Sequence, residues 1–190
     1  MFSFLAWPAL ALADFASGLD AFDRGDYAQA LSQFKPLASA GNARAEYRLG
    51  VCYAKGLGVA RDFGRAVKWL RKAADQGYAR AQNDLGILYD QGRGLASNPA
   101  QAAQWFGKAA AQGNGAAQFN LAQLYLDGRG VPKDPIEAFA CANAASESGE
   151  YGAERVVLAA GNGLDSVQIA KAERLATEYR KKFVTAFRQY

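Results

Sequence analysis

Pairs of glycines recur between the predicted helices, and they resemble a phosphate-binding motif more than any other residues in the chain do. Three Gly-x-Gly pairs occur, at Gly56/Gly58, Gly92/Gly94 and Gly128/Gly130. Glycine-rich loops can cradle phosphate groups, but the dinucleotide fingerprint requires a strand before the first glycine. These pairs lie between two helices and recur in every unit. We therefore interpret them as turns and predict no cofactor.

The side chains that could catalyse a reaction lack partners in the sequence. The chain has no histidine, the commonest general base and metal ligand. Serines such as Ser32, Ser97 and Ser166 therefore have no histidine to activate them. We expect Asp84 and Asp90 to lie on an exposed helix face as solvated carboxylates. The sequence predicts that the protein is not an enzyme.

The two cysteines, Cys52 and Cys141, cannot form a zinc site by themselves. They lie in different repeats, and stacked repeats are separated by about 8–10 Å each, too far for a disulfide. We expect two free thiols that act as small apolar packing residues, and no metal site.

Composition favours a single folded domain. Hydrophobic residues make up 51% of the 190, the net charge is +4, and the pI is near 9.1. Nucleic-acid binding requires Lys and Arg gathered on one face, and the densest run is only Arg180-Lys181-Lys182. No segment reaches the roughly 20 apolar residues of a membrane span. We predict no nucleic-acid partner, no membrane span in the mature chain, and a monomer.

The first 13 residues, MFSFLAWPALALA, are uncharged and end in small residues before Asp14. This pattern fits a signal peptide cleaved after Ala13, although no Lys or Arg precedes the apolar run. The alternative is an apolar helix that caps the repeats. With cleavage, the protein is periplasmic or secreted; otherwise it is cytoplasmic.

A pattern of 36 residues repeats three times in the middle of the chain. The shared slots are held by Ala45, Ala81 and Ala117, by Leu49, Leu85 and Leu121, by Tyr53, Tyr89 and Tyr125, and by Gly77, Gly113 and Gly149. A fixed period between about 20 and 50 residues is typical of stacked supersecondary units. Since each copy has the pattern of helix–loop–helix, we predict an all-α repeat fold.

Capping signals mark the helix ends. The first helix of the first copy is predicted over about 43–55, and Gly56 suits the left-handed position that follows it. Asp62, Asn98 and Asp134 are suited to cap the second helices of the three copies.

Two further signals lie outside the repeats. Pro36 predicts a kink or an early end in the helix over 27–39, because its ring clashes with the preceding turn. Asp165 and Gln168 have the spacing of a capping box at the start of the last helix.

Residue size varies at two packing slots. Gly50 and Gly86 are small enough for the two helices of a copy to approach closely. Trp69 and Trp105 share a slot that holds Cys141 in the third copy. We interpret this loss of bulk as a local adjustment.

The motif LGxxYxxGxGVxxDxxxAxxWxxKAAxxG resembles the Sel1-like repeat family, a relative of the tetratricopeptide repeat. In the first copy it is carried by Leu49-Gly50, Tyr53, Gly56, Gly58, Val59, Asp62, Ala66, Trp69, Lys72-Ala73-Ala74 and Gly77. The third copy departs from it at Ala122, Cys141 and Ser146.

The resemblance implies a right-handed α/α solenoid with a C-terminal capping helix. It also implies an adaptor role in protein–protein contacts; some exported members act in cell-envelope processes. The predicted division is a single domain over 14–190, with a shortened first unit at 14–42, repeats at 43–78, 79–114 and 115–150, and capping helices at 151–190.

The outward side of each first helix is predicted to line a concave groove. Its residues are Arg44, Tyr47, Arg48, Val51 and Lys55, then Arg80, Asn83, Asp84, Ile87 and Gln91, then Ala116, Phe119, Asn120, Gln123 and Asp127. Aromatic side chains with arginine are common hot-spot types. Two alternatives stay open: Tyr47 and Phe119 could pack against neighbouring helices, and the arginines could form a solvated face.

We predict a non-catalytic scaffold that binds a peptide or protein segment in this groove and is located in the cell envelope. One alternative is a cell-wall-active or β-lactam-binding secreted repeat protein, but those members carry spaced cysteine pairs that are absent here. Another is a structural spacer that binds through its convex face or its C-terminal helix.

Overall fold

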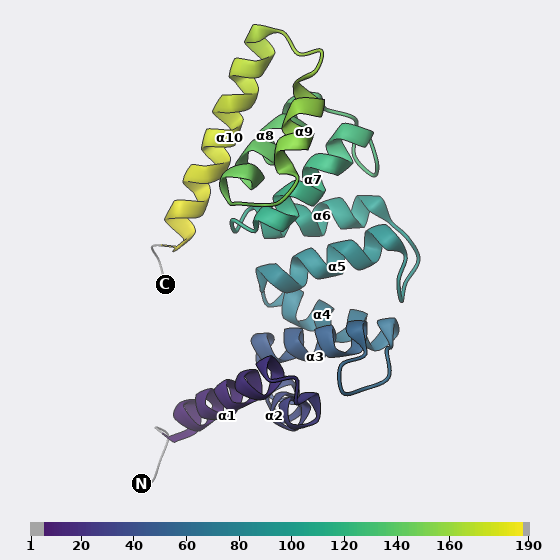
Figure 1. Cartoon of the computed structure of the whole chain (residues 1–190), viewed down its shortest axis with the longest axis vertical. Helices are drawn as coiled ribbons and strands as arrows, with labels where there is room; N and C mark the ends of the chain where they lie inside the picture. Colours follow the sequence, from purple (N-terminus) through teal and green to yellow (C-terminus); the bar gives the residue numbers. More distant parts are fainter. Residues whose placement is uncertain (1–5, 188–190) are drawn as a thin grey trace. The chain divides into compact units, whose positions relative to one another are not determined.

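The computed structural model describes residues 6–187, with side chains described for residues 15–180. Within that range all regular secondary-structure elements are helices, as predicted. The helices are α1 (Ala6–Asp23), α2 (Tyr27–Ser39), α3 (Ala43–Lys55), α4 (Phe63–Asp75), α5 (Ala79–Gln91), α6 (Pro99–Ala110), α7 (Gly115–Asp127), α8 (Pro135–Glu147), α9 (Ala153–Gly161) and α10 (Ser166–Phe187) (Figure 1).

The chain forms two compact units. The first extends through Ala81 and includes Arg93–Leu95; the second comprises Gln82–Gly92 and the chain from Ala96 onward. The division falls inside α5 and not at a boundary between repeats. That the two act as one domain over 14–190 stays a prediction.

The core of the first unit is built on aromatic side chains from α1 and α2. Phe34 is fully buried, and its ring centroid lies 5.7 Å from that of Phe15 and 6.4 Å from that of Phe22. A Cβ at Gly18 would come within 2.6 Å of the Phe34 ring, so only glycine allows α1 to approach α2 this closely. Leu49 of α3 joins the same core.

The predicted helix caps are confirmed. Asp62 accepts a hydrogen bond from the backbone N–H of Arg65 at 2.9 Å, and Asn98 accepts one from Gln101 at 3.0 Å. Each cap satisfies an N–H that has no partner inside its helix. Gly56 ends α3 with φ 75° in the left-handed region. The local sequence therefore fixes where these helices begin and end.

Of the kink or early end predicted at Pro36, the early end is wrong. Helix α2 continues to Ser39, and the backbone N–H of Ala40 donates to the Pro36 carbonyl at 3.0 Å. Leu37 and Ala38, which follow the proline, are buried. Packing of this last turn against the core offsets the hydrogen bond that proline removes.

The second unit repeats the helix pairing with altered residue sizes. In α5, a Cβ at Gly86 would lie 2.6 Å from the Phe106 ring of α6, which confirms the predicted close approach. In the third copy the glycine is replaced by Ala122, and Ala142 stands in the slot of Phe106. A larger residue on α7 is thus matched by a smaller one on α8.

Helix α10 packs along α8 and begins as predicted (Figure 1). The Asp165 backbone N–H donates to the Gln168 side chain at 2.9 Å, and the Gln168 N–H donates to the Asp165 carboxylate at 2.8 Å. This reciprocal pair confirms the capping box. Tyr179 and Arg180 of α10 bond to Glu137 and Glu147 of α8, respectively.

The second glycine of a Gly-x-Gly pair lies against the neighbouring helix pair. Gly130 has φ 71°, and a Cβ there would come within 2.3 Å of the Pro99 carbonyl carbon. Gly58 is similarly close to the side chain of Tyr27. The glycines are turn and packing residues, as predicted.

The predicted cleavage site lies within α1, which runs from Ala6 to Asp23. Residues 1–5 of the predicted signal peptide lie outside the described residues. Across residues 6–187, none of the helices has the length and apolar content needed to cross a membrane.

Candidate interaction surfaces and an internal pocket

In the first unit, two arginines predicted to face a partner lie over aromatic rings of α1. The Arg44 guanidinium carbon is 4.4 Å from the Phe15 ring centroid, and that of Arg48 is 5.0 Å from the Phe22 ring centroid. Stacking of this kind uses the flat face of the guanidinium and leaves its N–H edge able to donate.

The other predicted residues of this unit divide between packing and surface. The Tyr47 ring centroid is 5.1 Å from that of Tyr78, so Tyr47 contacts a neighbouring side chain. Val51 is buried, and the prediction that it faces outward is wrong. Lys55 and Arg80 are exposed.

In the second unit, the predicted face is crossed by a short chain of amide hydrogen bonds. Asn120 Nδ2 donates to Asn83 Oδ1 at 3.1 Å, and Asn83 Nδ2 donates to Asp84 Oδ1 at 3.2 Å. Asn83 is buried, so the prediction of an outward position is wrong for this residue too. The bonds link α5 to α7.

The apolar residues predicted for this face contribute to packing. Ile87 lies against the core between α6 and α7, and Phe119 lies against the core between α7 and α8. Gln123 is partly exposed. Asp90 is not a solvated carboxylate as expected, because Arg129 Nη1 donates to it at 2.9 Å.

A partly buried polar pair joins the two helices of a copy. In the first copy, Gln76 Nε2 donates to Glu46 Oε2 at 2.7 Å. In the second, 36 residues later, Gln112 Nε2 donates to Gln82 Oε1 at 2.8 Å. Glu46 and Gln82 are only 3% and 5% exposed. The glutamine that follows each second helix therefore satisfies a buried acceptor on the first.

The third copy lacks this pair. Gln118 occupies the slot of Glu46 and Gln82, but the slot of Gln76 and Gln112 holds Ser148. The Ser148 hydroxyl donates instead to the carbonyl of Ala144 at 3.0 Å. Gln118 is 1% exposed, and neither its Nε2 nor its Oε1 has a hydrogen-bond partner among the side chains described, residues 15–180. An unpaired buried amide costs about 1–3 kcal/mol.

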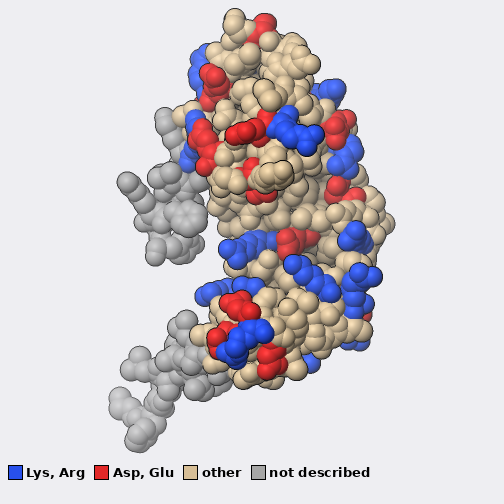
Figure 2. All heavy atoms as spheres, in the orientation of Figure 1, with Lys and Arg blue, Asp and Glu red and all other residues tan. Residues whose placement is uncertain are grey.

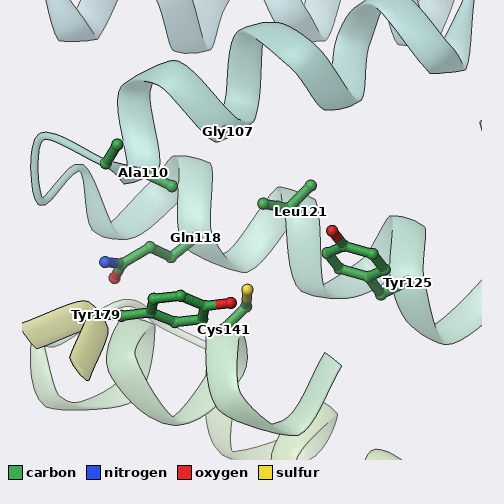
Figure 3. Close-up of a pocket in the computed structure, with 8 residues that line it drawn as sticks. Gly107, Ala110, Gln118, Leu121, Tyr125, Cys141 and Tyr179 are labelled. Carbon is green, nitrogen blue, oxygen red and sulfur yellow. The ribbon is translucent and has the colours of Figure 1, made fainter. Parts of the chain in front are cut away.

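Beside this amide lies a pocket of about 220 Å³ within the second unit (Figure 3). Small residues of α6 (Gly107, Ala110 and Ala111) and Gln118, Leu121 and Tyr125 of α7 form part of its wall. Cys141 of α8 and Tyr179 of α10 also line it. Cys141 replaces the tryptophan of the other copies, so the loss of bulk predicted to be a local adjustment leaves a pocket.

The electrostatics of the pocket favour neutral groups. Burial, and to a lesser extent the Glu137 carboxylate, raises the pKa of the Cys141 thiol to about 12. Burial and a 2.5 Å hydrogen bond to Glu137 raise the pKa of the Tyr179 hydroxyl. Burial also raises the pKa of Tyr125. None of the described residues that line the pocket is Lys or Arg.

Comparison with protein families decides the identity of the repeats. A model of the Sel1 repeat matches residues 43–78, 79–114 and 115–150, the boundaries predicted from the sequence. These three segments make up more than half of the chain. The chain belongs to the Sel1 repeat family. Proteins of this family are generally non-enzymatic scaffolds for protein interactions.

Solved structures of Sel1 repeat proteins resemble this Sel1 repeat chain. A Sel1 repeat protein from Oxalobacter formigenes is 29% identical, with a TM-score of 0.74 over 88% of this chain and 70% of that one. The protein c5321, a protective antigen present in uropathogenic Escherichia coli strains, is also 29% identical, with a TM-score of 0.64. That match covers 91% of this chain but only 46% of c5321. Comparison with curated proteins found no match.

The remaining surface of the Sel1 repeats shows no concentrated chemistry in the part described. Among side chains 15–180, no group of three or more Cys, Asp or Glu could hold a metal ion. On the face drawn in Figure 2, basic side chains intermingle with acidic ones and with uncharged surface.

Gln118 and Ser148 were not among the residues predicted from the sequence to form a site. The sequence does show a departure from the repeat there, because positions 76 and 112 hold glutamine whereas position 148 holds serine. The consequence of this serine cannot be read from the sequence, since only the structure shows that those glutamines donate hydrogen bonds to the side chains at positions 46 and 82.

Proposed function

We propose that this Sel1 repeat protein is a non-catalytic adaptor that binds a peptide or protein segment through the first helices of its repeats. One observation carries the proposal: the core leucine slot of the first helices keeps its residue type in all three copies, whereas an outward slot on the same helices changes. Leu49, Leu85 and Leu121 are constant, but Arg48, Asp84 and Asn120 occupy a common outward slot. A varied outward slot on helices that share a core leucine suits recognition of a partner.

The chemistry of the first unit favours an acidic segment. Arg44 and Arg48 are held over aromatic rings, and Lys55 and Arg80 are exposed. Stacking restricts a guanidinium before a partner arrives, so less conformational entropy is lost when it binds a carboxylate.

Charge reversal tests this surface. Acidic peptides selected from a random library would be titrated against the wild type and a Lys55→Glu/Arg80→Glu variant. These two residues are preferred because Arg44 and Arg48 also support the packing of α1. We expect a loss of affinity of about tenfold or more, because opposing charges become like charges.

The matched control reverses two exposed lysines on the second helices, Lys35→Glu and Lys68→Glu, which changes the net charge by the same amount. It should bind the peptides nearly as well as the wild type. Equal losses in both variants would show only a general charge effect, and no loss in either would remove the first helices of this unit as the binding surface.

We also propose that the protein acts in the cell envelope after cleavage at Ala13. The apolar segment ending in Ala11-Leu12-Ala13 supports this location. The mass of the protein recovered from a periplasmic fraction should correspond to a chain that begins at Asp14. A chain recovered intact from the cytoplasm, starting at Met1, would contradict the proposal.

A second binding surface is favoured by exposed apolar side chains near α9. Tyr151, Leu158 and Val167 are 96%, 74% and 73% exposed. They support the alternative of a spacer that binds a partner near its C-terminal helix. A Tyr151→Ser/Leu158→Ser variant that loses a partner still bound by the Lys55→Glu/Arg80→Glu variant would favour this alternative.

A further inference from the structure

We propose that the pocket between α6, α7, α8 and α10 binds a neutral ligand whose primary carboxamide pairs with the side chain of Gln118. This site is separate from the outward slots of the proposed adaptor surface and does not depend on them. The proposal rests on an unpaired buried amide, the cavity beside it, and the pairing seen in the other two repeats.

The repeats themselves indicate the ligand's functional group. In the first two copies, a glutamine carboxamide donates to the side chain at position 46 or 82. In the third, Gln118 keeps both a donor and an acceptor, but Ser148 is too short to pair with it and bonds within its own helix. A primary carboxamide from a ligand would supply the group that the chain supplies elsewhere, and it can donate and accept at once.

The rest of the pocket sets the ligand's polarity and size. A volume of about 220 Å³ is larger than the roughly 150 Å³ apolar cavity that holds benzene in a well-studied lysozyme variant. The side chains of Leu121 and Cys141 provide apolar contacts, and the nearby Glu137 disfavours an anion. The pocket therefore fits a small apolar body that carries one amide.

Entry of the ligand requires a small rearrangement at α10. The polar atoms of Gln118 are inaccessible to water, and the ring of Tyr179 lies beside the amide (Figure 3). Tyr179 belongs to the helix that packs on α8. We expect its side chain to shift when the ligand reaches Gln118.

Benzamide is a suitable probe, since it joins a primary carboxamide to an apolar ring. Titration would be followed by NMR of the side-chain amide of Gln118 and the backbone amide of Leu121. We expect saturable shifts with benzamide. Benzoate, which has nearly the same shape, should bind at least about tenfold more weakly, because a buried carboxylate without a cation is unfavourable.

Two variants test the role of Gln118. Ser148→Gln supplies the missing glutamine from the chain itself and should abolish the benzamide shifts. Gln118→Leu removes the amide and should weaken binding by about tenfold or more. The matched control, Gln82→Leu, changes the equivalent residue in the second repeat and should leave benzamide binding unchanged. NMR spectra of each variant show whether it is folded.

The proposal would be overturned by an absence of saturable shifts, which would mean that the pocket holds water only. It would also be overturned by equal binding of benzoate, or by undiminished binding to folded Ser148→Gln. A short apolar peptide containing one glutamine, compared with its glutamate counterpart, distinguishes the source of the amide. Binding of both the glutamine peptide and benzamide supports a side chain of a partner, and binding of benzamide alone supports a free small molecule.

Discussion

Buried polar side chains distinguish the three repeats from one another at the level of single residues. Glu46 and Gln82 accept hydrogen bonds from glutamines, whereas Gln118 has no partner within the described part of the chain. The Glu46 carboxyl also bears a cost of burial, which raises its pKa despite the nearby Lys72 and the bond from Gln76. The same slot therefore contributes differently to stability in each copy.

Replacing the unpaired amide by an apolar group should stabilise the protein. We expect Gln118→Leu to raise the free energy of unfolding by about 1 kcal/mol, because it removes two buried polar atoms that lack partners. Gln82→Leu, the matched change, should stabilise less or destabilise, since it breaks the bond from Gln112. Urea denaturation of both variants measures the difference; a greater loss in Gln118→Leu than in Gln82→Leu would contradict it.

Buried thiols should make the protein less stable in alkaline solution. The pKa values of Cys52 and Cys141 are raised to about 11 and about 12, mainly by burial. The unfolded thiols, with ordinary pKa values near 9, release protons first, so the free energy of unfolding should fall as pH rises above about 9.

Urea denaturation between pH 8 and pH 11 measures this fall. A Cys141→Ala variant should show a shallower slope, by up to about 1.4 kcal/mol per pH unit above the ordinary thiol pKa. Exposed Ser97→Ala provides a control that should leave the slope unchanged. Identical slopes in all three proteins would show that Cys141 does not contribute.

At the level of elements, the turns between helices depend on glycine for contact as well as for conformation. Gly130 and Gly149 both have positive φ, 71° and 78°. A Cβ at Gly130 would meet the backbone of Pro99, whereas one at Gly149 would meet nothing within 4 Å. The turn at Gly130 therefore also allows one helix pair to pack closely against another.

These two glycines give a matched test of inter-repeat packing. We expect Gly130→Ala to destabilise by about 2–4 kcal/mol, through left-handed strain and displacement of the α6 backbone. Gly149→Ala should cost only about 1 kcal/mol, because it adds strain without a clash. Thermal denaturation compares the two, and equal losses would contradict the packing role of Gly130.

At the level of the whole molecule, the chain divides into two compact units, and α10 belongs to the second. Its Tyr179 lines the pocket and bonds to Glu137, and its Arg180 bonds to Glu147. The last helix therefore both covers α8 and completes the pocket.

Removal of α10 should loosen the second unit selectively. In a chain that ends at Asp165, we expect hydrogen exchange of the α8 amides to become at least about tenfold faster, because their cover is lost. The amides of α3 and α4 should keep their protection. Unchanged exchange in α8, with folding confirmed by circular dichroism, would show that α10 does not stabilise this unit.

The sequence by itself determined the repeats, the helix ends and the family. These features depend on local chemistry: Asp62 and Asn98 cap helices through residues three positions away, and Gly56 takes a conformation that glycine tolerates best. The same residue types recur at 36-residue intervals in the three copies, so each copy supports the assignments made in the other two. The residues of the outward surface were also named from this periodicity, with Val51 and Asn83 wrongly included.

Only the tertiary structure decided which departures from the repeat matter. Ala122 is compensated by Ala142, which lies in the same core, whereas the change from tryptophan to Cys141 leaves space and the change to Ser148 leaves Gln118 unpaired. Compensation depends on contacts between residues far apart in the chain, and on Tyr179 from a helix outside the repeats. For that reason the pocket could not be predicted from the pattern that revealed the fold.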